Sequence, residues 1–144
     1  MGRDPASPPR LDRDRLALLP VARSVDPADC RAALLDGGPA FLDFVLAQDL
    51  GPLWHHRLQA AGLLDSLPAA SADALRAARQ TAAAGYLAHR WALAQVDALF
   101  SAQGIAYGVI KGVYVRECIY PDPALRPASD MDILVAPQDR RRAA

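Results

Sequence analysis

The sequence has 144 residues, 52% of them apolar, and sixteen basic residues balance sixteen acidic ones. This length fits one domain or part of one, and the apolar share excludes a wholly disordered chain. A net charge of zero gives no long-range attraction to nucleic acid, so nucleic-acid binding is not expected. No apolar run approaches the roughly 18 residues of a membrane span. We therefore expect a cytoplasmic protein without membrane contact, in which Cys30 and Cys118 are free, buried thiols.

The N-terminal stretch carries alternating charges and several prolines, and residues 1–20 are predicted to be a disordered arm. Residues 21–103 are predicted to form a helical region. Capping and breaking residues divide this region into successive helices, because prolines are tolerated at helix starts and glycines interrupt them. The dividing motifs are Asp26-Pro27, Asp36-Gly37-Gly38-Pro39, Gly51-Pro52 and Ser71, the last of which is expected to cap a long helix.

The long helix has an apolar residue at every third or fourth position, which is typical of a helix with one buried face. Gly104 has the residue type that commonly ends a helix. The apolar stripe consists of Leu75, Ala78, Ala82, Tyr86, His89, Leu93, Val96 and Phe100.

After Gly104 the pattern changes from helical to strand-like. Residues 105–110 are continuously apolar, which predicts a strand buried on both faces. A short helix is expected over residues 113–119, and a second strand over residues 129–136, after a proline-rich loop. The sequence therefore predicts an α+β fold in which a helical region precedes a strand–helix–strand unit.

Two short motifs in this unit have the residue types for chemistry on phosphates. Alternate residues of a strand face the same way, so Asp130 and Asp132 could share Mg²⁺ or Mn²⁺. The alternative for this pair is a solvated loop-to-strand junction. Lys111 and Gly112 precede a helix, whose free N–H groups attract anions, although a plain turn has the same sequence. Arg126 either pairs with the acids or binds a phosphate.

The motifs of residues 104–135 occur in a definite order: Gly104-Ile105, Ile110-Lys111-Gly112, Tyr120-Pro121, Arg126-Pro127 and Ser129-Asp130-Met131-Asp132-Ile133-Leu134-Val135. This order resembles the uncharacterised nucleotidyltransferase family, which belongs to the polymerase β-like nucleotidyltransferase superfamily. The helices from about Phe41 to Phe100 also resemble the helical region of that family. By this resemblance, residues 104–144 are a partial nucleotidyltransferase catalytic core.

The resemblance implies metal-dependent transfer of a nucleoside monophosphate from an NTP to an acceptor that the sequence does not identify. Two metal ions would activate the acceptor hydroxyl and clamp the phosphoryl oxygens. The implied catalytic and metal-binding residues are Asp130 and Asp132, and the implied substrate-binding residues are Lys111, Gly112, Arg126 and Ser129.

The sequence departs from the superfamily pattern in two places. Val113 stands where a second glycine or a serine is usual, and the strand with the third carboxylate is not reached. We therefore expect a C-terminally truncated member, and whether this chain catalyses transfer by itself stays open. Two further hypotheses are a non-catalytic helical interaction module with a vestigial site and a glycosyltransferase that uses a DxD motif. The edge of the last strand could also pair with a second copy of the chain.

Overall fold

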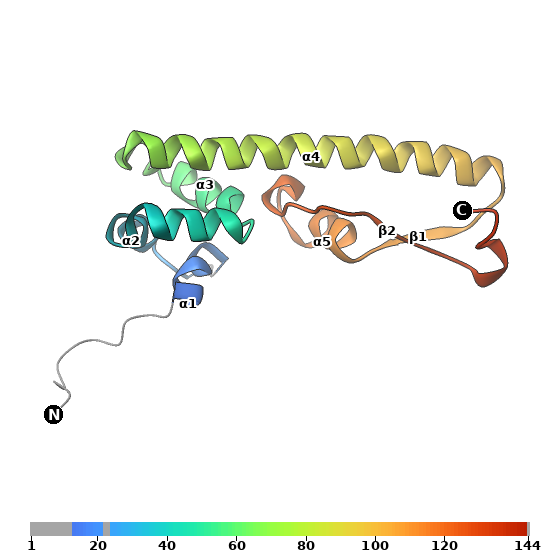
Figure 1. Cartoon of the computed structure of the whole chain (residues 1–144), viewed down its shortest axis with the longest axis horizontal. Coiled ribbons are helices and arrows are strands. Elements are labelled where there is room, and N and C mark those ends of the chain that lie inside the picture. The colour runs from blue at the N-terminus through green and yellow to red at the C-terminus, as the bar shows by residue number, and fades with distance from the viewer. Residues whose placement is uncertain (1–12, 22–23, 144) are drawn as a thin grey trace, which may run out of the picture.

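The structure is a computed structural model that describes residues 13–21 and 24–143. It has an α+β fold with five helices and two strands in these ranges: α1 (Arg13–Ala17), α2 (Pro27–Ala47), α3 (Gly51–Ala60), α4 (Ala69–Ala102), β1 (Tyr107–Ile110), α5 (Lys111–Ile119) and β2 (Asp132–Val135). Helix α4 extends along the molecule, with α2 and α3 beneath its first half and α5 and the strands beneath its second half (Figure 1). No helix in the described part of the chain is long and apolar enough to cross a membrane.

Helix α2 begins and bends where the sequence predicts. The Asp26 side chain caps the helix by accepting a hydrogen bond from the N–H of Ala28 at 2.8 Å. Gly38 has φ 61° and ψ −162°, a backbone conformation that essentially only glycine adopts. The predicted interruption is therefore confirmed as a kink within one element, and Pro39 opens its second part.

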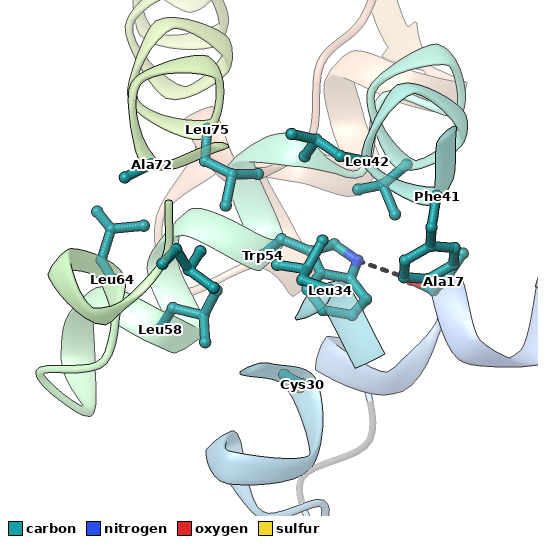
Figure 2. Packing of buried hydrophobic residues seen from close by; sticks show 12 residues of the cluster. Ala17, Cys30, Leu34, Phe41, Leu42, Trp54, Leu58, Leu64, Ala72 and Leu75 are labelled. Atoms are coloured by element: carbon teal, nitrogen blue, oxygen red, sulfur yellow. Dashed lines mark hydrogen bonds between the residues drawn. The ribbon is translucent and has the colours of Figure 1, made fainter. Parts of the chain in front are cut away.

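Part of the predicted N-terminal arm is ordered. Residues 1–12 lie outside the described residues, but residues 13–20 form α1 and most of a 3-10 turn over Leu19–Val21. Ala17 is buried, and its carbonyl oxygen accepts a hydrogen bond from Nε1 of Trp54 at 2.9 Å (Figure 2). The composition of the arm could not predict this contact, because the contact depends on Trp54, which is distant in the sequence.

The main core lies among α1, α2, α3 and the first turns of α4. Phe41 and Trp54 pack edge to face with ring centroids 5.8 Å apart. Cys30 is buried in this core, whereas Cys118 is exposed on α5, so both thiols are free but only one is buried as expected. The buried members of the cluster are Ala17, Cys30, Leu34, Phe41, Leu42, Val45, Trp54, Leu58, Leu64, Leu67, Ala72 and Leu75.

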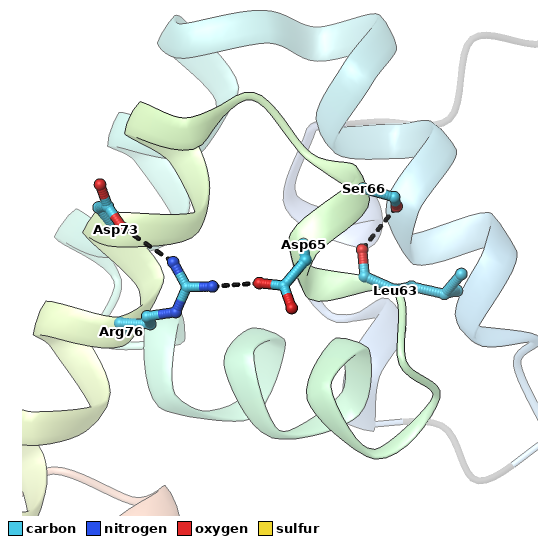
Figure 3. A network of polar contacts seen from close by, with 5 residues as sticks. All are labelled: Leu63, Asp65, Ser66, Asp73 and Arg76. Carbon is cyan, nitrogen blue, oxygen red and sulfur yellow. Dashed lines mark hydrogen bonds and ion pairs between the residues drawn. The ribbon is translucent and has the colours of Figure 1, made fainter.

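Helix α4 begins at Ala69 rather than at the predicted Ser71 cap. The N–H groups of Ser71 and Ala72 both donate to the carbonyl oxygen of Pro68, so Ser71 lies inside the first turn. Arg76 then joins this turn to the preceding loop, because its guanidinium pairs with Asp65 and Asp73 (Figure 3). In that loop the Ser66 hydroxyl donates to the Leu63 carbonyl oxygen at 2.6 Å.

Gly104 ends α4 as predicted, with φ 65°. The N–H of Ile105 donates to the Phe100 carbonyl oxygen at 2.9 Å, and the N–H of Gly104 donates to that of Ser101 at 3.1 Å. This pair of hydrogen bonds is the Schellman arrangement, which favours glycine at the left-handed position. The chain thereby reverses into β1.

Strands β1 and β2 pair antiparallel, with Tyr107 opposite Val135 and Ile110 opposite Asp132. The expectation of a strand buried on both faces over residues 105–110 was wrong. Strand β1 is shorter and alternates between half-buried and exposed residues, and Leu134 on β2 is 62% exposed. In β1 the half-buried residues Tyr107 and Val109 alternate with the exposed Gly108 and Ile110, whereas Ile105, just before the strand, is buried.

The assignment of the core predicts how two leucines differ. Leu58 has no exposed surface, whereas Leu87 on the outer face of α4 is 66% exposed. We expect Leu58→Ala to lower the free energy of unfolding by about 2–5 kcal/mol, because a cavity remains. The matched Leu87→Ala should change it by no more than about 0.5 kcal/mol. Chemical denaturation measures both, and similar losses would contradict the placement of the core.

Candidate functional site

The pairing of the strands brings the start of α5 against the start of β2. Ile110 is the last residue of β1 and lies opposite Asp132. Lys111 follows immediately, and its Nζ lies 3.1 Å from Oδ1 of Asp132. The side chains of Lys111 and Asp132 are 68% and 31% exposed, so their ion pair stabilises the fold by no more than about 1 kcal/mol. The ion pair matters mainly for the site, because it holds a positive and a negative group side by side.

These groups line a cavity of about 430 Å³, which we call the acidic cavity. It lies between the junction of α2 with α3 and the elements α5 and β2. Its volume is in the range of small-molecule sites. All six residues that the sequence singled out line it: Lys111, Gly112, Arg126, Ser129, Asp130 and Asp132.

Asp130 reaches the acidic cavity from a loop and not from a strand. Strand β2 begins only at Asp132, so the predicted strand over residues 129–136 was too long. The register would place Gly112 opposite Asp130, but Gly112 already belongs to α5 and offers no strand partner. The two carboxylates therefore share a cavity without sharing a strand face.

Two residues of the cavity have an unusual backbone conformation. Among the described residues, Asp49 and Lys111 are the non-glycine residues with positive φ, at 57° and 56°. Both line the acidic cavity. A left-handed backbone costs free energy for residues with a Cβ, and such residues concentrate at functional sites. This observation supports the assignment of the cavity independently of its motifs.

Sequence reasoning missed Asp49. It lies two residues after the end of α2 and two residues before Gly51-Pro52, and so looks like an ordinary turn residue. No local signal connects it with residues 111–132, because only the packing of the helical region against α5 and the loop before β2 brings them together. Gln48 and Tyr120 also line the cavity; Gln48 was not singled out from the sequence, and Tyr120 was named only as part of the family motif.

A buried arginine fixes α5 on α4. Arg116 is 2% exposed, and its Nη1 lies 3.1 Å from Nδ1 of His89. Its guanidinium lies 5.1 Å from the centre of the Tyr86 ring, a cation–π contact. Burial lowers the pKa of Arg116 from its usual value, and the neighbouring Glu117 carboxylate opposes this shift. These contacts hold α5, and with it Lys111, in place.

An ion pair fixes the loop between α5 and β2. Asp122 accepts a hydrogen bond from the N–H of Ala124 at 2.9 Å and so caps the 3-10 turn η3 (Pro123–Leu125). The same carboxylate pairs with Arg79 of α4. Because Arg126 and Ser129 follow this turn, the ion pair orients the segment that carries them toward the acidic cavity.

Three carboxylates line the acidic cavity: those of Asp130 and Asp132, which are close in sequence, and that of Asp49. The described residues contain no group of three or more His, Cys, Asp or Glu side chains that could hold a metal ion. Mg²⁺ is commonly held by one or two carboxylates, while waters and substrate phosphates complete its shell. Asp130 and Asp132 therefore fit a Mg²⁺ ion that arrives together with a phosphate ligand.

The sequence matches the model of a family described as uncharacterised nucleotidyltransferase over residues 38–144. The match spans well over half of the chain, and the protein therefore belongs to this family. The matched region starts at the kink of α2 and includes the second part of α2, α3, α4 and the strand–helix–strand unit, which confirms the resemblance seen in the sequence. No curated protein and no solved structure matches the chain.

The environment of Gly112 predicts that this position tolerates a side chain. A Cβ built there would lie 3.7 Å from the Cβ of Ala128, which is an ordinary contact. We expect Gly112→Ala to leave the free energy of unfolding unchanged or to raise it by up to about 1 kcal/mol, because alanine favours helices. Chemical denaturation of the variant beside the parent tests this, and a clear loss of stability would show that α5 and Ala128 cannot adjust.

Proposed function

We propose that the acidic cavity binds Mg²⁺ and an NTP and that the protein transfers a nucleoside monophosphate to an acceptor. The observation that carries this proposal is the convergence of all six motif residues on one cavity, although they come from α5, a loop and β2. Membership of the nucleotidyltransferase family supports the class of reaction. The metal, the substrate and the residue roles are part of the proposal.

The roles follow from charge and position. Asp130 and Asp132 would hold Mg²⁺, which supplies positive charge to the phosphate oxygens. Lys111 supplies a second positive charge, and the α5 N-terminus adds N–H donors beside it. Gly112 lets a phosphate approach the backbone closely.

Two exposed side chains of the loop complete the proposed phosphate site. Arg126 presents a fork of donors that matches two phosphate oxygens, and Ser129 presents a hydroxyl donor. Catalysis of phosphoryl transfer depends mainly on such positioning and on stabilising charge.

The proposal predicts a ligand-dependent gain in stability that requires the acids. A ligand that binds only the folded chain, at a hundredfold excess over Kd, adds about 2.7 kcal/mol to the free energy of unfolding. We expect Mg²⁺ with an NTP to raise the thermal unfolding midpoint of the parent but not of Asp132→Asn. Each protein is compared with and without ligand, so the loss of the Lys111 pair does not affect the comparison.

The matched control is Asp43→Asn, an exposed residue of α2 that does not line the acidic cavity. This variant should keep the full ligand-dependent rise. A rise that persists in the double variant Asp130→Asn/Asp132→Asn would place the nucleotide elsewhere and contradict the proposal. Transfer itself is measured as pyrophosphate released from the NTP when pools of hydroxyl-bearing acceptors are added, with the double variant as the blank.

A further inference from the structure

A second cavity of about 360 Å³, which we call the side cavity, adjoins the acidic cavity. The two share Asp49, Pro127 and Ala128, so they meet at the end of α2 and at the loop before β2. One wall of the side cavity is the middle of α4, with Thr81, Ala82, Gly85 and Tyr86.

The lining of the side cavity is unlike that of the acidic cavity. The described residues that line it include no basic side chain, and their charged member is Asp49 at the boundary. A phosphate would find no positive partner there. Small apolar residues and the Tyr86 ring instead suit a flat, uncharged group, and the contact with Arg116 holds this ring in position.

We propose that the side cavity holds the nucleoside part of the NTP, an inference that rests on the proposed function. The chemical order of an NTP is triphosphate, ribose and base. The residues that line the two cavities follow the same order: Lys111 and Asp132 lie in the acidic cavity, Asp49 at the boundary, and Tyr86 in the side cavity. The Asp49 carboxylate accepts hydrogen bonds from the ribose hydroxyls, and the base packs against Tyr86.

Gly85 supports this inference because the fold does not need a glycine there. A Cβ built at Gly85 meets no atom within 4 Å, and glycine costs about 1 kcal/mol relative to alanine inside a helix. Gly85 therefore leaves free space at this wall of the side cavity. A larger residue at this position would fill the proposed nucleoside pocket without a clash at its Cβ.

The test compares NTPs with inorganic tripolyphosphate, each with Mg²⁺, by titration calorimetry. The four common NTPs are tested in turn. The parent should bind at least one of them more tightly than it binds tripolyphosphate. Gly85→Leu should lower NTP affinity roughly tenfold or more, toward that of tripolyphosphate, and leave tripolyphosphate binding unchanged. The thermal unfolding midpoint of Gly85→Leu should be no lower than that of the parent. The matched control is Ala88→Leu, at an exposed α4 residue outside both cavities.

A second variant tests the ribose contact. Asparagine tolerates the left-handed backbone of residue 49, so Asp49→Asn should fold. The parent should prefer an NTP over its 2′,3′-dideoxy analogue by roughly tenfold, because a hydrogen bond to a charged group is lost with the hydroxyls. In Asp49→Asn this preference should become smaller, because the amide oxygen still accepts a hydrogen bond but carries no charge.

The outcomes separate the inference from the proposed function. Unchanged NTP affinity in Gly85→Leu, with binding still abolished by Asp132→Asn, overturns the nucleoside pocket and leaves the proposed function standing. Unchanged NTP affinity with loss of transfer would assign the side cavity to the acceptor and also overturn the inference. A parent that binds neither NTP nor tripolyphosphate overturns both proposals.

Discussion

The apolar stripe of α4 is the constraint on which the remainder of the structure depends. Over 34 residues this helix packs first against α2 and α3 and then against the 3-10 turn η3. Its side chains also contact α5 and β1. Leu75 is fully buried in the main core, while Phe100, seven turns later, meets Tyr107 edge to face at 5.4 Å. One continuous helix therefore sets the spacing between the helical region and the sheet. Both cavities lie where these two parts meet, and α4 forms one wall of the side cavity.

The small sheet relies on this support. A two-stranded sheet is marginally stable in water, and β1 and β2 have four residues each. The buried Arg116 and the Arg79–Asp122 ion pair attach the flanking α5 and η3 to α4. Within the described residues, Nε and Nη2 of Arg116 have no hydrogen-bond partner, and an incompletely paired buried cation costs free energy. Its contacts with His89 and Tyr86 orient α5 rather than maximise stability.

The parts of the fold that sequence reasoning predicted depend on local chemistry. Asp26 caps a helix, and Gly38 and Gly104 break or end one, because of properties of those residues alone. The six motif residues were found because their order is characteristic of a family, although the order alone did not show that they line one cavity. What the sequence did not reveal depends on partners distant in the chain. Ala17 is buried because of Trp54, and Asp49 joins the acidic cavity because α2 ends beside it.

The difference between local chemistry and contacts with distant partners also explains the errors in the strand predictions. Apolar runs predict a strand but not how many neighbours will cover it, so β1 was expected to be buried on both faces. The ends of a strand are set by its partner. Asp130 falls outside β2 because the opposite position is already helical.

The Lys111–Asp132 pair places a positive and a negative group in the acidic cavity. This arrangement suits a ligand that itself carries both a cation and an anionic group. Each group neutralises the other, and their exposure keeps the strength of the pair at about 1 kcal/mol or less. Under the proposed function, Asp132 would pair with a divalent cation in place of the Lys111 ammonium, and Lys111 would pair with a phosphate in place of the Asp132 carboxylate. Neither charge is left unpaired, so separating the two groups costs little. A ligand that carries only a phosphate would leave Asp132 without a cation, which favours a metal–nucleotide complex over the bare nucleotide.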